Sequence, residues 1–95
     1  MARHHNRLTV VGRGRRAFQN GDWLSVMAGR HWELLELSPS RFVCQFETLK
    51  NPLPALQHLS RSHPGLVFLL GYETSRCLGL ARAKAGQLIQ HRVQY

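Results

Sequence analysis

The chain has 95 residues, of which 43% are hydrophobic and 19% are charged, and its formal net charge is +8. This composition is typical of one globular domain and excludes a disordered chain. No apolar run approaches the roughly 20 residues that cross a bilayer, and the N-terminus lacks the apolar stretch of a signal peptide. We therefore predict a single soluble, cytoplasmic domain that spans residues 1–95. In a reducing compartment its cysteines, Cys44 and Cys77, are expected to be free thiols.

The basic residues are concentrated at the two ends of the chain. Residues 1–30 carry six Arg against Asp22, a net +5, and residues 75–95 carry four basic residues and no acid, a net +4. Residues 31–74 carry three basic and four acidic residues, a net −1. Eleven of the thirteen basic residues are Arg, which suits bidentate contacts with phosphate. The charge indicates either an anionic partner or a solvated surface that promotes solubility.

The N-terminal part predicts a strand followed by helix. Residues 7–12 (RLTVVG) are β-branched and apolar and end at Gly, which predicts a strand in a central position. Residues 15–20 are expected to form a short helix around Phe18. Asp22 is a candidate N-cap for a further helical turn. The apolar residues of that turn are Trp23, Val26 and Met27.

Residues 31–37 and 42–47 predict a β-hairpin with its turn at residues 38–40 (SPS). A strict two-residue repeat in the first strand places Trp32, Leu34 and Glu36 on one face and the residues between them on the other. In the second strand the same repeat predicts a buried face. Its residues are Phe42, Cys44 and Phe46.

A second helix is expected to begin at Asn51-Pro52, because Asn is a good N-cap and Pro fits the first helical turn. The segment 62–65 (SHPG) ends this helix, since Pro disfavours helical geometry in the residue before it. The apolar stripe of the helix is Leu53, Leu56 and Leu59. Three further strands are predicted at residues 66–72, 77–84 and 88–95.

The predicted order is β-α-β-β-α-β followed by two strands. It predicts an α+β fold, a ferredoxin-like βαββαβ sandwich with an appended C-terminal β-meander, an antiparallel-rich sheet and helices on one face. In this topology the first strand is central and pairs with the strands before and after the second helix. We expect Phe46 and Phe68 to lie under that helix with Leu56 and Leu59. The two basic ends of the chain are then expected on the same side of the sheet.

Several short motifs occur in an order that resembles a known family. They are residues 6–12 (NRLTVVG) with Phe18, residues 46–48 (FET), Asn51-Pro52, residues 63–66 (HPGL), Tyr72-Glu73 and Gly79. Together they resemble the YubB-type ferredoxin-like domain family of plasmid- and phage-associated proteins, over residues 6–18 and about 42–95. The sequence departs from the family pattern at Arg3-His4-His5 and at Leu49. The resemblance implies the fold and a mobile-element setting, and it implies no established activity.

The sequence contains no recognisable catalytic, metal or cofactor motif. Residues 11–16 (VGRGRR) follow a strand and are either a phosphate cradle or a plain basic turn, and they lack the Gly-Lys-Ser/Thr of a Walker loop. The six His have no metal-ligand spacing. Cys44 lies on the apolar strand face, where a thiol is inert. We therefore expect no catalytic residue, no metal and no cofactor, and an enzyme is only the third hypothesis.

The leading hypothesis is a small nucleic-acid-binding accessory protein of mobile-element type that contacts the phosphates of DNA or RNA. No base-reading motif is present, so its sequence preference is expected to be weak. The residues assigned to phosphate contact are Arg7, Arg13, Arg15, Arg16, Arg82, Lys84 and Arg92.

The alternative is a protein-interaction or homodimerisation module that uses the sheet face away from the helices. That face is predicted to be more apolar than a solvated sheet normally is. The residues assigned to this interface are Leu35, Val43, Val67 and Leu69.

Overall fold

The computed structural model describes residues 3–13 and 23–94 and shows an α+β fold. The strands are β1 (His4–Val11), β2 (Arg30–Leu37), β3 (Phe42–Thr48), β4 (Val67–Glu73), β5 (Cys77–Lys84) and β6 (Gln87–Gln94). The helices are α2 (Trp23–Met27) and α3 (Leu53–Ser62). The predicted helix at residues 15–20 lies outside the described residues. Within the described ranges no helix is long and apolar enough to cross a membrane.

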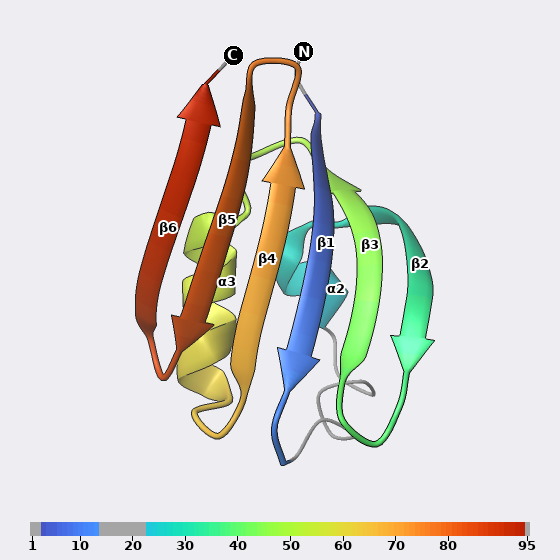
Figure 1. The fold of residues 1–95 in the computed structure, drawn as a ribbon, viewed down its shortest axis with the longest axis vertical. Coiled ribbons are helices and arrows are strands. Elements are labelled where there is room, and N and C mark those ends of the chain that lie inside the picture. Colours follow the sequence, from blue (N-terminus) through green and yellow to red (C-terminus); the bar gives the residue numbers. More distant parts are fainter. Residues whose placement is uncertain (1–2, 14–22, 95) are drawn as a thin grey trace.

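The strands form one six-stranded sheet in the order β2-β3-β1-β4-β5-β6, and every neighbouring pair is antiparallel (Figure 1). β1 is central and pairs with β3 and β4, the strands before and after α3, as predicted. β1 ends at Val11 because Gly12 has a φ of 125°. A side chain there would also place its Cβ 2.7 Å from the carbonyl oxygen of Gly65, so only Gly fits.

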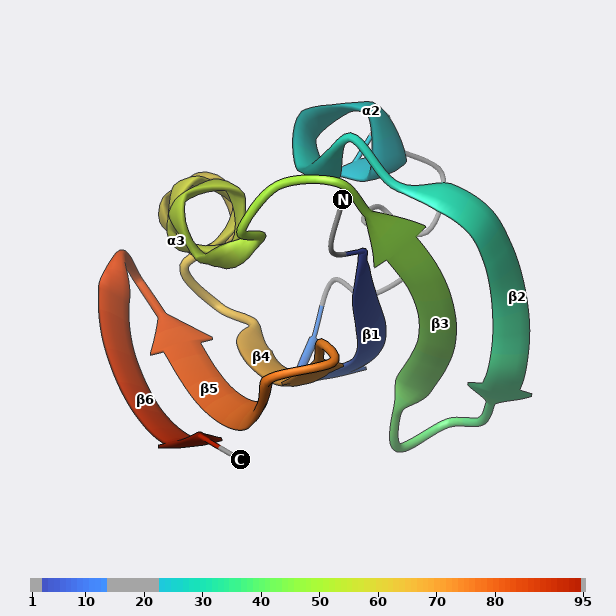
Figure 2. The same ribbon diagram turned by 90° about the horizontal axis from the view of Figure 1, so that it is seen from above.

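Both helices cover the same face of the sheet, which curves around them (Figure 2). Phe42, Cys44 and Phe46 are buried on this face, as their spacing predicts. Phe46 packs edge-on against Trp23 of α2, with 5.5 Å between the ring centroids. Phe46 thus packs against α2, and it shares one buried core with Phe68, Leu56 and Leu59, the residues with which it was predicted to lie.

Helix α3 begins where its caps predict, with one difference. Leu53 donates its backbone N–H to Oδ1 of Asn51 at 3.0 Å, and Pro52 stands between them as the residue before the helix. Asn51 thus caps the helix from one position further out than expected. The predicted apolar stripe is confirmed. Its buried residues are Leu53, Leu56 and Leu59.

Strand β2 does not keep a simple two-residue repeat. Its pairing with β3 shifts between Arg30 and Glu33 and again between Leu34 and Glu36. As a result Glu33 pairs with Gln45 and Glu36 pairs with Val43, which puts both carboxylates on the face away from the helices. The expected grouping of Glu36 with Leu34 is wrong, because each bulge adds a residue and reverses the alternation after it.

Candidate interaction surface on the open face of the sheet

Strand β5 points its large side chains away from the helices and its small ones towards them. Gly79, Ala81 and Ala83 are buried on the helix side, whereas Leu78 and Leu80 are 44% and 63% exposed. A Cβ at Gly79 would overlap the ring of Tyr72, so the packing under the helices requires a residue without a side chain. The leucines of β5 therefore point to the open face, which is the sheet face away from the helices.

Large aliphatic side chains from β4, β5 and β6 occupy neighbouring positions on this open face. Leu78 pairs with Val93, while Arg82 pairs with both Leu69 and Ile89. The aliphatic side chains on this part of the open face, Leu80 included, are between 40% and 63% exposed. We call this set the apolar face. It consists of Leu69, Leu78, Leu80, Ile89 and Val93.

A hollow of about 520 Å³ lies within the apolar face. Gly71, which has no side chain, lines this hollow and is the register partner of both Arg7 and Leu80. Leu69 and Leu80 contribute apolar walls, and Arg82 and Arg7 also line it. The hollow therefore combines aliphatic walls with cationic groups.

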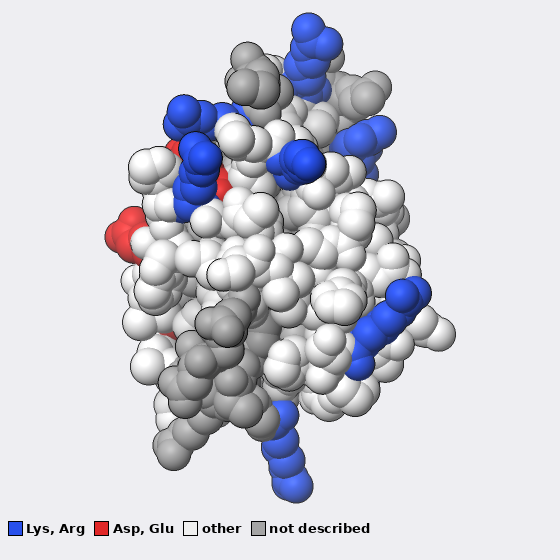
Figure 3. Space-filling view, turned by 180° about the vertical axis from the view of Figure 1, so that it is seen from behind, with Lys and Arg blue, Asp and Glu red and all other residues white. Residues whose placement is uncertain are grey.

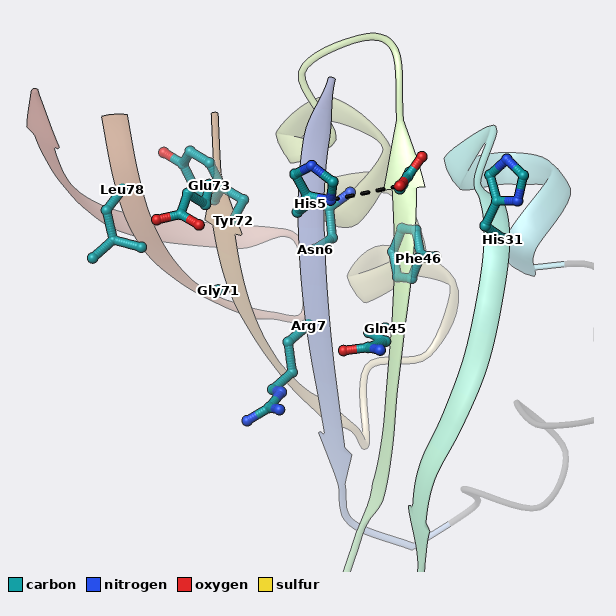
Figure 4. Close-up of a pocket in the computed structure, with 11 residues that line it drawn as sticks. His5, Asn6, Arg7, His31, Gln45, Phe46, Gly71, Tyr72, Glu73 and Leu78 are labelled. Carbon is teal, nitrogen blue, oxygen red and sulfur yellow. Dashed lines mark ion pairs between the residues drawn. The ribbon is translucent and has the colours of Figure 1, made fainter. Parts of the chain in front are cut away.

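The end of the open face formed by the start of β1 is polar (Figure 4). His5 stands in register between Glu47 and Glu73, and its Nδ1 lies 3.6 Å from Oε1 of Glu47. Arg3 also pairs with Glu47, at 3.3 Å. The side chains of Arg3 and His5 are more than half exposed, so water screens these ion pairs and they add little to stability.

The thiol of Cys44 lies in the core, on the helix side of β3. Burial raises the pKa of Cys44 to about 12, so the thiol stays protonated at neutral pH. Residues 3–13 and 23–94 contain no group of His, Cys, Asp and Glu side chains that could hold a metal ion.

The residues predicted to contact phosphate are only partly brought together. Arg7, Arg82 and Lys84 share the open face. Arg92 lies on the helix side, because it pairs with Gly79, so its assignment to the same surface is wrong. Arg13 follows the end of β1, and Arg15 and Arg16 lie outside the described residues. On the helix side, the Lys and Arg side chains are spread around a mainly uncharged middle (Figure 3).

Three of the four residues predicted to form an interface, Val43, Val67 and Leu69, lie on one part of the open face. Val43 and Leu69 both flank Thr9 in register, and Val67 pairs with Val11. Of these, Val43 is buried and Val67 is partly buried, while Leu69 is 40% exposed. Leu35 falls at the second register shift of β2 and has no partner residue in β3.

The prediction missed most of the apolar face. The residues it missed are Leu78, Leu80, Ile89 and Val93. The alternation of large and small residues in 78–83 (LGLARA) was the available signal. Alternation alone does not show whether the large or the small residues face the core.

No protein-family model matches the chain, and no curated protein or solved structure matches it. What the open face does is therefore inferred from its own residues.

Proposed function

We propose that the protein is a small interaction module that self-associates through the apolar face. The observation that carries this proposal is that five exposed aliphatic side chains of β4, β5 and β6 share the open face, where Leu78 pairs with Val93 and the others stand next to Arg82 or His91. An antiparallel sheet with one open face normally presents polar residues to water. A contiguous exposed apolar surface is a common mark of a protein-binding site, because covering it removes apolar area from water.

Our proposal for the fold is a ferredoxin-like domain extended at one edge. The order of the first four strands, β2-β3-β1-β4, supports it, and the complete sheet differs because β5 and β6 continue beyond β4. Three expectations from the sequence stay predictions: membership of the YubB-type family, a mobile-element setting and a cytoplasmic location.

Replacing Leu80 with Glu is expected to abolish self-association, since it places a charge at the most exposed position of the apolar face. Sedimentation velocity over a range of concentrations should show a dimer for the wild type and a monomer for Leu80→Glu, with unchanged circular dichroism. Leu37→Glu is the matched control, because Leu37 is 59% exposed and lies on β2, outside the apolar face. The Leu37→Glu variant should therefore still dimerise. A wild type that stays monomeric at every concentration would contradict the proposal.

Nucleic-acid binding is the second candidate function, and the placement of basic residues supports it. Arg7, Arg82 and Lys84 form no ion pair with a carboxylate of residues 3–13 and 23–94. They lie on the same open face, in a chain of net charge +8. Unpaired guanidinium and ammonium groups on one face suit contacts with successive phosphates.

If this candidate is right, changing Arg7, Arg82 and Lys84 together to Ala should weaken binding to DNA and RNA of any sequence. The log–log salt slope should also become shallower by about 0.7–0.9 per lost phosphate contact. Arg41→Ala is the control, because Arg41 is already paired with Glu36 at 2.7 Å. Fluorescence anisotropy at low salt measures both quantities. Absence of wild-type binding to any nucleic acid at low salt would rule the candidate out.

A further inference from the structure

The hollow within the apolar face carries charged groups of one sign. Of the described residues that line it, only Arg7, Arg82 and His91 have side chains that carry a charge or can gain one, and all three are basic. Neither arginine forms an ion pair with a carboxylate of residues 3–13 and 23–94. The charge of the hollow is therefore complementary to that of an anion.

The two arginines stand on opposite sides of Gly71. Arg7 is its direct partner on β1, and Arg82 is its diagonal neighbour on β5, two residues beyond Leu80. Direct partners lie about 5 Å apart and diagonal neighbours about 7–8 Å apart, both within reach of long side chains. Among described atoms outside the chain neighbours of Gly71, only Cδ2 of Leu80 lies within 4 Å of the place where a Cβ would stand. A small anionic group above Gly71 can therefore be reached by both guanidinium groups.

The other walls of the hollow are mainly aliphatic. Leu80 stands in register between Gly71 and His91, and Ile89 pairs with Arg82. Leu80 and Ile89 are 63% and 59% exposed, so a hydrocarbon chain that covers them removes apolar area from water. The volume of about 520 Å³ falls within the roughly 300–1,000 Å³ of small-molecule sites. The hollow thus suits a ligand with an anionic head and an apolar chain.

We propose that the hollow binds a single-chain aliphatic carboxylate, such as a medium-chain fatty acid. The carboxylate lies above Gly71 between Arg7 and Arg82, and the hydrocarbon chain runs across Leu80 and Ile89 towards the edge of the sheet. A guanidinium group matches a carboxylate in planar, bidentate geometry. A phosphate monoester suits the hollow less, because its second charge would lose water beside aliphatic walls. The inference goes beyond self-association, since one copy of the chain supplies every contact.

Calorimetric titration with octanoate tests the class of ligand. Saturable one-to-one binding is expected, and 1-octanol should bind about tenfold or more weakly, because it has no charge for the arginines. Butyrate should bind far more weakly than octanoate, since each buried methylene group strengthens binding by up to about fourfold. Equal affinities for octanol and octanoate would overturn the proposal, as the walls would then adsorb any chain. Tighter binding of octyl phosphate than of octanoate would overturn the choice of a carboxylate.

Single charge changes test the position of the carboxylate. Arg7→Gln and Arg82→Gln should each weaken octanoate binding by about tenfold or more. Lys84→Gln is the matched control, because Lys84 carries the same charge two residues from Arg82 on β5 and does not line the hollow. Circular dichroism checks that each variant is folded. If Lys84→Gln weakened binding as much as Arg82→Gln, the attraction would come from the net charge of the chain and the site would be wrong.

Filling the hollow tests the site without changing any charge. Gly71→Val places a branched side chain in the open space above β4, and valine is well suited to a strand. This variant should lose octanoate binding while its circular dichroism stays that of the wild type. A folded Gly71→Val variant that binds octanoate as the wild type does would overturn the placement of the ligand.

Backbone amide shifts in NMR spectra locate the ligand and separate this inference from the proposed function. Octanoate should shift the amides of Gly71, Leu80 and Ile89 and leave that of Leu37 on β2 unchanged. Shifts confined to other residues, or no binding at all, would overturn the proposal. A wild type that stays monomeric and binds octanoate at these residues supports this inference and contradicts self-association. A wild type that dimerises and binds no octanoate does the reverse.

Discussion

Truncating Phe68 to Ala is expected to lower the free energy of unfolding by about 3–5 kcal/mol, the usual loss for a fully buried aromatic residue. Phe68 is 0% exposed in the middle of the core face, and its ring lies 6.5 Å from that of His63. Removing the ring leaves a cavity that the surrounding strands cannot close. Since a domain of this size typically has about 5–15 kcal/mol of stability in total, the variant loses a large part of its stability. Urea denaturation followed by circular dichroism measures the change.

Leu37→Ala is the control for this experiment, because Leu37 is 59% exposed and its truncation should change stability by only about 0.5 kcal/mol. Equal urea midpoints for Phe68→Ala and the wild type would show that the core face of β4 is assigned wrongly.

Gly79→Ala is expected to destabilise the fold by about 1–3 kcal/mol, although it adds only a methyl group. The new Cβ would overlap the ring of Tyr72, which is 3% exposed and donates its hydroxyl to Oε1 of Gln90 at 3.2 Å. To relieve the overlap, either the tyrosine ring leaves its buried position or β5 moves away from the core. Thermal and urea unfolding should both report the loss.

Gly71→Ala is the matched comparison, one strand away. An ideal Cβ there lies 3.6 Å from Cδ2 of Leu80, an ordinary contact, so the substitution is expected to be neutral or stabilising by roughly 0.5–1 kcal/mol. If both variants lost stability equally, the loss would come from backbone conformation and not from the tyrosine.

Local patterns predicted the elements well because each has its own physical signal. The turn around Ser38 and the break at Pro64-Gly65 separate the strands and the helix, and the apolar repeat around Cys44 identifies a core face. These signals depend only on residues close together in the sequence, so they can be recognised without knowing the tertiary contacts. The central position of β1 followed from its continuous apolar run.

The open face was predicted less completely because its composition depends on contacts distant in the sequence. Whether Leu80 or Ala81 points inward is decided by the space that Tyr72 and α3 leave above β5, which no local pattern contains. The same holds for Arg92, whose side of the sheet follows from its pairing with Gly79. In β2, the positive φ of His31, 54°, accompanies a bulge that a strict repeat does not predict.

The central place of β1 also determines the order in which the sheet can assemble. β1 is the first strand in the chain, yet its neighbours begin at Phe42 and Val67, so both of its pairings close long loops. By contrast, β4, β5 and β6 follow one another through short turns and can pair locally. We therefore expect the β4–β6 meander and the β2–β3 hairpin to form early as separate pieces. Joining them through β1 is then the slow, topology-limited step of folding.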